Sequence, residues 1–274
     1  MSISLTDFRA KLNNLLGDIV DGTTTANGDE NKKTFIDTQL AAYPDHWFAG
    51  KTAYLPDVPE ARDVEDSLQP EGVIIVRNAF TSQVLSSVAY ELHRFHPDKK
   101  KVAINQALYA AYPYLYKRLE DVSLTGTGDS DTEYDVPVAF SDRFPDQVWL
   151  KTTSSTLISF ERFYDFDFKD VAGSKKFYAD IATTKTILLI GKTWLTQFTN
   201  DASTTELTDE QAEVVALKAA ANLYRMYSGI INAQDSSRFD ELANRRDAEF
   251  EGLIKRKRMP ELYRLGLDWT WLDD

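Results

Sequence analysis

The 274-residue chain contains no cysteine, which excludes disulfide bonds, zinc–thiolate sites, iron–sulfur clusters and thiol nucleophiles. It has only three histidines, so imidazole-rich metal sites and histidine-dependent catalytic triads are hard to assemble. We therefore predict no metal site, no cofactor and no catalytic residue, and expect a protein that is not an enzyme.

Long apolar runs and excess positive charge are also missing. The longest apolar run, residues 107–112, is far below the roughly 18 residues of a membrane span, and we expect no membrane contact. The net charge is −12, with the acidic excess concentrated in residues 1–70 and 201–274. Such a surface repels nucleic acid at long range, which argues against general DNA binding.

What the chain does contain is enough apolar material for a core, since 43% of its residues are hydrophobic and 12% aromatic. Apolar residues at helical spacing predict helices over 5–16, 81–95, 97–112, 208–231 and 236–257. Thr208 and Gln211 match the capping-box pattern at the start of one of them.

Strand-like runs gather in the middle of the sequence. β-Branched and aromatic residues separated by turn residues predict strands over 73–76, 133–140, 147–152, 157–164, 176–181 and 186–190. Residues 35–71 contain four prolines and few periodic apolar positions, so we interpret them as an extended arm with aromatic anchors.

These elements predict an α+β fold: a helical bundle with an inserted small antiparallel β domain and extended N- and C-terminal arms. The expected parts are an N-terminal helix and extended arm (1–70), the first half of the bundle (71–120), the inserted β domain (121–200), the second half of the bundle (201–258) and a C-terminal docking tail (259–274).

Motifs with possible chemistry are weak. Gly50–Thr52 and Gly191–Thr193 resemble the end of a phosphate loop but lack its upstream glycine. His93 and His96 have metal-ligand spacing without a clear third ligand, and a position near a helix C-terminus is the simpler interpretation. A short acidic cluster lacks the glycine and the distal glutamate of a calcium loop, and we interpret it as surface acids: Asp165, Asp167 and Asp170.

Aromatic and apolar residues near both ends of the chain are the candidates for partner binding. They are Tyr43, Trp47 and Phe48 in the arm, and Leu262, Tyr263, Leu265, Trp269, Trp271 and Leu272 in the tail. Tryptophan and tyrosine are favoured anchors of protein interfaces. Two interpretations stay open, because the tail can insert into a partner or fold back over its own bundle.

Two basic runs complete the candidate set. Lys255, Arg256, Lys257 and Arg258 follow a predicted helix, and they either contact phosphate in a DNA channel or complement the helix dipole. Residues 99–101 are three lysines at a helix start, where the dipole disfavours cations. We expect acidic neighbours or another subunit to hold them.

The layout resembles one known family. Helical residues 102–108 lead to the motif at 112–116, a strand-rich insertion begins at 133–137, and an Ala-rich helix pair with an aromatic tail follows. Over about residues 73–120 and 205–258 this resembles the head–tail connector (adaptor) proteins of tailed bacteriophages. The resemblance lies in architecture and texture rather than in a diagnostic motif.

The resemblance implies a homo-oligomeric ring, commonly of twelve copies, that docks on the portal protein and joins the capsid to the tail. It also implies a place in the phage neck after synthesis in the host cytoplasm, with DNA as non-specific cargo of the channel. The tail would then reach into the portal, and the 1–70 arm would contact a neighbouring subunit or a collar or tail protein. The alternatives are a tail terminator or other neck or collar protein, and a hydrolase with acidic residues in the β domain.

Overall fold

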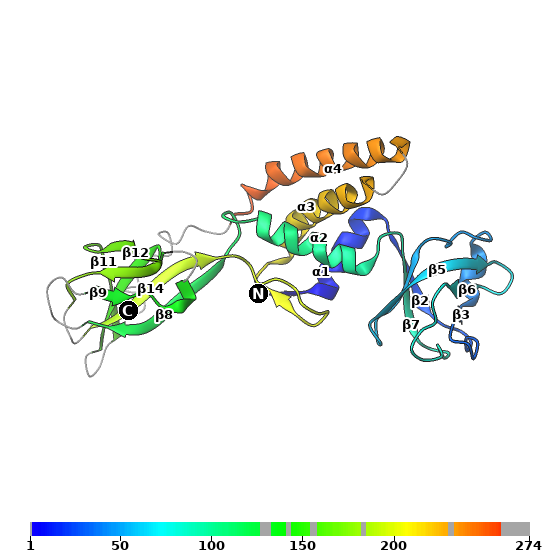
Figure 1. Cartoon of the computed structure of the whole chain (residues 1–274), viewed down its shortest axis with the longest axis horizontal. Coiled ribbons are helices and arrows are strands. Elements are labelled where there is room, and N and C mark those ends of the chain that lie inside the picture. The colour runs from blue at the N-terminus through cyan, green and yellow to red at the C-terminus, as the bar shows by residue number, and fades with distance from the viewer. Residues whose placement is uncertain are drawn as a thin grey trace, which may run out of the picture. The chain divides into compact units, whose positions relative to one another are not determined.

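A computed structural model describes residues 2–126, 133–140, 144–153, 158–181, 185–229 and 233–258. The described residues form two compact units: residues 2–110 with 197–257, and residues 111–196. The described residues contain four α-helices and several antiparallel sheets (Figure 1), which confirms the predicted α+β class.

The helices of the first unit follow their sequence signals closely. They are α1 (Leu5–Leu16), α2 (Pro97–Ala110), α3 (Asp209–Ser228) and α4 (Ala233–Ile254). Ser4 caps α1 by accepting a hydrogen bond from the Asp7 N–H, and Gly17 ends it in the left-handed conformation with φ 60°. Thr208 and Gln211 form the predicted capping box of α3, and α3 packs against the other three helices.

Six antiparallel strands of the first unit form one sheet in the order β2-β7-β4-β5-β6-β3. Their bounds are β2 (Ile19–Thr23), β3 (Thr34–Ile36), β4 (Thr52–Leu55), β5 (Glu60–Leu68), β6 (Val73–Val76) and β7 (Ala89–His93). Just after β2, the Thr25 N–H donates to the Ile36 carbonyl of β3 at 2.8 Å, and Ala26 bridges to Ile36. The two edge strands therefore meet, and we call residues 19–93 the barrel.

The barrel corrects two expectations. Residues 35–71 are not an extended arm, because they supply β3, β4, β5 and the 3₁₀ helix η1 (Thr38–Ala42), and their prolines lie in the connections between these elements. Residues 81–95 are not a helix. Val84 and Leu92 enter the barrel core from a loop and from β7, respectively, whereas Leu85 is exposed. Of residues 71–120, only α2 is helical.

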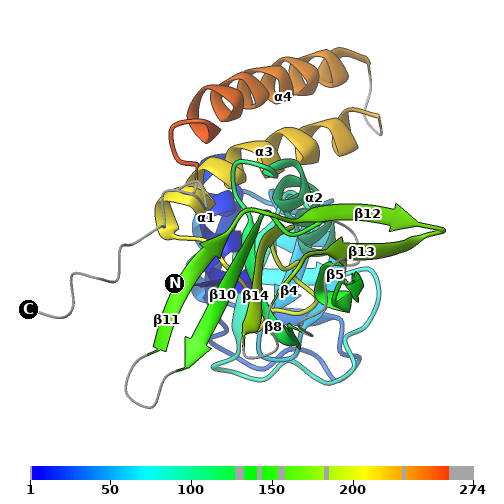
Figure 2. The same cartoon turned by 90° about the vertical axis from the view of Figure 1, so that its left-hand side faces the viewer.

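The second unit is a β sandwich built from residues 117–193 (Figure 2). One sheet has the order β11-β10-β14-β8, and the other has the order β12-β13-β9. Alternate residues of β10 and β14, among them Val148, Leu150, Ile187 and Leu189, share a core with Tyr134 and Phe177 of the other sheet.

The strands of this unit are β8 (Lys117–Thr125), β9 (Glu133–Asp135), β10 (Gln147–Thr153), β11 (Ile158–Phe163), β12 (Asp167–Val171), β13 (Ser174–Tyr178) and β14 (Thr186–Thr193), with the 3₁₀ helix η2 (Val138–Phe140) after β9. The unit begins near residue 111 rather than 121, because β8 pairs with β14 along its length. A short pair, β1 (Ile3–Ser4) with β15 (Thr204–Thr205), joins the N-terminus to the start of α3 in the first unit.

Candidate functional site

The three aromatic residues predicted to bind a partner from the N-terminal segment have different environments. Trp47 is 52% exposed, Tyr43 is half-buried, and Phe48 is buried in the barrel core. Tyr43 stacks on Trp47 with ring centroids 6.4 Å apart and meets the edge of Phe48 at 4.9 Å. Phe48 is therefore a core residue and its predicted role is wrong, whereas Trp47 stays a candidate contact.

The basic run follows the end of α4 and is exposed over residues 255–258. Lys257 Nζ lies 2.5 Å from Glu210 Oε2, and the Lys257 carbonyl accepts from the Gln211 side chain at 3.4 Å. This lysine thus ties the end of α4 to the start of α3. Contact of Lys255, Arg256 and Arg258 with phosphate stays a prediction.

Six predicted tail contacts lie outside the described residues: Leu262, Tyr263, Leu265, Trp269, Trp271 and Leu272. Their role stays a prediction as well.

The two closely spaced histidines do not form a pair. His93 ends β7 and is fully buried, whereas His96 precedes α2 and accepts from the Asp98 N–H at 3.2 Å. Neither lies at a helix C-terminus, so that interpretation is wrong. In the described part of the chain, no group of three or more His, Cys, Asp or Glu side chains could hold a metal ion.

The acidic cluster serves the β12–β13 hairpin. Asp170 Oδ1 accepts the Gly173 N–H at 2.9 Å, and Asp167 pairs with Lys169 at 3.1 Å, while Asp165 is exposed. These contacts stabilise a turn and a surface strand.

The densest polar constellation lies inside the first unit, where the barrel meets the helices, and the sequence analysis did not identify it as a site. Its centre is Lys100 on α2, which is fully buried. Lys100 Nζ lies 2.7 Å from Asp18 Oδ2, 2.5 Å from Asn13 Oδ1 and 2.8 Å from His93 Nδ1. An ammonium group has three donors, and here each donor faces one acceptor.

This geometry determines the protonation of His93. Because Nδ1 accepts from Lys100, the ring proton sits on Nε2, which donates to Glu91 Oε2 at 2.8 Å. Burial lowers the pKa of His93, although its hydrogen bond to Glu91 opposes this effect, and the nearby Lys100 charge adds to the lowering. The imidazole is therefore neutral and links a cation to a carboxylate.

Burial also lowers the pKa of Lys100, although the neighbouring Asp18 charge opposes this effect. Asp18 has a second task, because its carboxylate accepts the backbone N–H groups of Arg94 at 2.6 Å and of Phe95 at 3.2 Å. It thereby fixes the turn between β7 and α2.

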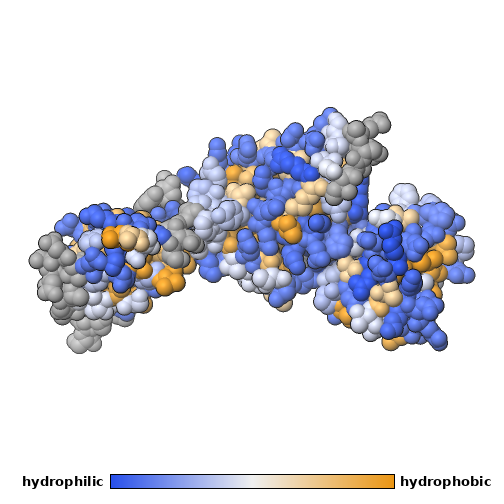
Figure 3. Space-filling model, viewed as in Figure 1, coloured by the Kyte–Doolittle hydropathy of each residue, from blue (hydrophilic) through white to orange (hydrophobic). Residues whose placement is uncertain are grey.

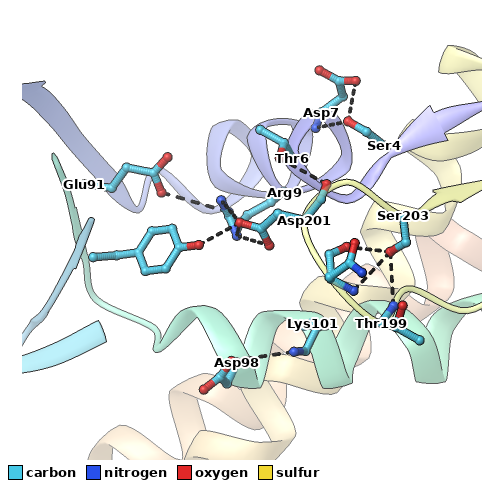
Figure 4. A network of polar contacts seen from close by, with 12 residues as sticks. Ser4, Thr6, Asp7, Arg9, Glu91, Asp98, Lys101, Thr199, Asp201 and Ser203 are labelled. Atoms are coloured by element: carbon cyan, nitrogen blue, oxygen red, sulfur yellow. Dashed lines mark hydrogen bonds and ion pairs between the residues drawn. The ribbon is translucent and has the colours of Figure 1, made fainter. Parts of the chain in front are cut away.

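A second group of contacts continues the network toward the loop before α3 (Figure 4). Arg9 of α1 lies between Glu91 and Asp201, with its guanidinium nitrogens 3.9 Å and 3.3 Å from their carboxylates. The Tyr54 hydroxyl donates to Asp201 at 2.6 Å, and burial together with this hydrogen bond raises the pKa of Tyr54 to about 12. Arg9 also lies over the Tyr54 ring, 4.9 Å from its centroid.

The network is suited to holding the fold together rather than to reacting with a substrate. The side chains of Lys100, Asp18 and His93 have no exposed surface, so a substrate does not reach them in this structure. Together with Asn13 of α1, they connect α1, β7 and α2, and thus fix the barrel to the helices. The expectation that acidic neighbours hold the lysines at the start of α2 is confirmed for Lys100 and for Lys101, which pairs with Asp98 at 3.8 Å.

A sequence signal for this site existed. Lys100 falls on the same helical stripe as Ile104 and Ala107, both of which are buried. A lysine on an apolar stripe requires a buried partner. The pattern did not indicate which residue that partner is.

Large apolar side chains are exposed on both units, and Figure 3 shows apolar residues in orange on the face of each unit that is in view. On the first unit they include Trp47, Val58 and Leu85 of the barrel and Val102 and Tyr109 of α2. On the β sandwich, Val138 is 87% and Tyr164 is 74% exposed. Interaction sites are often built around exposed apolar groups, so these residues are candidates for contacts.

No helix in the described ranges has the length and apolar character that crossing a membrane requires. Comparisons with protein-family models, with curated proteins and with solved structures find no match to this chain.

Proposed function

We propose that this protein is a non-enzymatic virion component, a ring-forming head–tail connector that docks on the portal of a tailed phage and joins the capsid to the tail. The sequence-level resemblance to connector proteins suggests this role. The presence of exposed apolar side chains on both compact units is the observation that carries it.

A protomer of a closed ring needs two different faces, because a head-to-tail contact joins unlike surfaces of adjacent copies. A connector needs further faces for the components above and below the ring. Trp47 on the barrel and the pair Val138 and Tyr164 on the sandwich provide apolar groups on both units.

The sandwich has the most exposed large apolar residues of the described chain, Val138 and Tyr164. We therefore assign the contact between copies to the sandwich, and the contact with a portal or tail component to Trp47 on the barrel. If the protein forms rings through the sandwich contact but these rings do not bind the portal, it is better described as a tail terminator or other neck protein.

The charge of the chain is compatible with a DNA channel. A net charge of −12 disfavours long-range attraction of phosphate, which suits a channel through which DNA moves without binding. The basic run at 255–258 is the local exception. A connector of this kind would treat DNA as cargo, with no sequence readout.

Native mass spectrometry and negative-stain imaging of the full-length chain, alone and mixed with portal rings, test the proposal. We expect closed rings, commonly of twelve copies, either in solution or on the portal. Val138→Ser with Tyr164→Ser should abolish rings. Trp47→Ser should leave rings intact but weaken portal or tail binding, and Val58→Ser, at an equally exposed barrel position, is the matched control.

A wild-type chain that stays monomeric both alone and with portal and tail components would refute the connector role. Rings that persist in the sandwich variant would place the contact between copies elsewhere.

A further inference from the structure

The solvent-facing side of α2 has an open groove of about 370 Å³, which the network and the proposed ring contacts leave unused. Val102, Asn105, Gln106 and Tyr109 of α2 line it together with Gln197. Val102 is 44% and Tyr109 is 52% exposed, and both lie on one face of the helix, two turns apart.

The groove has a rigid wall and polar groups at its rim. Asn105 is held in place because its amide donates to the Phe198 carbonyl at 2.9 Å and accepts the Phe198 N–H at 2.9 Å. Gln106 and Gln197 are exposed and present side-chain amides beside the apolar groups. An apolar slot with amides at its edge suits a tryptophan, whose ring is apolar and whose indole N–H requires an acceptor.

A segment with this chemistry lies in the same chain. Residues 259–274 follow the end of α4 and contain leucines together with Tyr263, Trp269 and Trp271. The last described turn is tied to the start of α3 through Lys257 and Glu210, so this segment departs from that end of the helical layer.

The segment begins near the C-terminal end of α2, where Tyr109 lies. The His96 N–H donates to the Tyr227 hydroxyl, and the Asn222 side chain donates to the Ala103 carbonyl. Between these two contacts the residue number rises along α2, from 96 to 103, and falls along α3, from 227 to 222. The two helices are therefore antiparallel. The start of α3 therefore lies toward the Tyr109 end of the groove.

The segment is long enough to reach the groove. From Asn222 back to Glu210, α3 covers about 18 Å, and from Ala103 to Gln106, α2 advances about 4.5 Å in the same direction. The remaining axial gap is about 14 Å. Because α4 packs on α3 and α3 packs on α2, two helix spacings of about 8–10 Å each also have to be crossed, which gives a path of roughly 21–24 Å. An extended chain covers roughly 24 Å from residue 259 to Gly266.

The charges are complementary along the same path. The segment carries four acids and one base: Glu261, Asp268, Asp273, Asp274 and Arg264. The far end of the groove is the N-terminus of α2, where the helix dipole is positive and two lysines reach solvent, at positions 99 and 101. A segment that enters at the Tyr109 end brings its acidic residues toward these lysines.

We infer that residues 259–274 occupy the α2 groove of their own chain in the unassembled subunit. The apolar side chains fill the slot between Tyr109 and Val102, and the acidic end lies near Lys99. The contact covers the exposed apolar surface of Val102 and Tyr109 on α2. The inference concerns the isolated subunit and does not depend on the connector role.

The absence of native cysteine allows a direct test. Gln106→Cys and Gly266→Cys are introduced together into the full-length chain, and a short bismaleimide joins cysteines that lie close together. We expect an internal cross-link with the mass of one chain. Its yield should be several times that of the control pair Ser237→Cys with Gly266→Cys, whose first position is exposed on α4.

Two further measurements complete the test. Val102→Asp should lower the cross-link yield to the control level, whereas Val58→Asp, at an exposed apolar position on the barrel, should not change it. The two single-cysteine variants, mixed at micromolar concentration, should give no cross-linked dimer. Equal yields in the groove and control pairs would overturn the inference, and a cross-linked dimer would overturn it in favour of docking on a second copy.

Discussion

Replacing Lys100 with methionine isolates the contribution of the buried network. Methionine has a similar length but lacks the charge and all three donors. The variant leaves the Asp18 carboxylate buried without its cation. It also leaves the acceptors Asn13 Oδ1 and His93 Nδ1 without the donor that Lys100 supplied. Unpaired buried acceptors and charges are costly, because water no longer solvates them.

The magnitude follows from what remains around Asp18. Breaking a buried ion pair by removing one partner costs about 3–5 kcal/mol. The backbone N–H groups of Arg94 and Phe95 still donate to the carboxylate, which offsets part of this cost. We therefore expect a loss of about 3–4 kcal/mol, a large fraction of the roughly 5–15 kcal/mol that stabilises a typical domain.

Hydrogen exchange followed by mass spectrometry is the suitable assay, because it measures opening segment by segment in a chain with two units. For Lys100→Met, amides of α2 and β7 should exchange faster by roughly two to three orders of magnitude, since 1.4 kcal/mol corresponds to tenfold. Amides of β10 in the sandwich should not change.

Lys101→Met is the matched control. Lys101 is the next residue on the same helix, and its partly exposed ion pair with Asp98 is worth at most about 1 kcal/mol. If Lys100→Met accelerates exchange no more than Lys101→Met, the network does not hold the barrel to the helices. Adding Asp18→Asn to Lys100→Met removes the stranded charge and should recover about 1–2 kcal/mol.

Three further predictions test the surroundings of this network. Because the folded-state pKa of His93 lies below its ordinary 6.5, acid favours the unfolded chain; stability should fall as pH drops through 6.5, and His93→Gln should flatten this dependence in urea titrations. Tyr54→Phe removes a hydroxyl that donates to a carboxylate and should cost about 1.5–3 kcal/mol in the same titrations. Gly72→Ala should destabilise the barrel by more than about 1 kcal/mol, because φ is 62° and the new Cβ would lie 2.0 Å from the Asp37 carbonyl oxygen. Gly50→Ala is the control, since its φ is 75° but the space around it is open, and it should destabilise the barrel less. Equal losses of stability in the two variants would contradict the steric argument.

The sequence alone determined the elements whose signals are local. Ser4 and Gly17 delimit α1, and the capping box at Thr208 starts α3, because each cap forms within a few residues of the helix that it ends. Alternation and turn residues likewise identified most strands of the sandwich. These local signals were sufficient for the α+β class.

Only the tertiary structure decided the barrel. β7 pairs with β2 and β4, which lie far away in sequence, and the closing contact joins Ala26 to Ile36. Short strands interrupted by prolines have too little local pattern to be distinguished from an extended arm. Val84 and Leu92 had helical spacing, but the gain from burial in the barrel core outweighed local propensity.

The buried network shows the same division. The sequence placed Lys100 on an apolar helix stripe, and this position by itself required a partner. The partner is Asp18, which lies more than eighty residues earlier in the chain and fixes the turn before α2. A helix stripe is a local property of the chain, whereas the pairing of two buried charges depends on how distant segments pack, and only the folded chain brings these segments together.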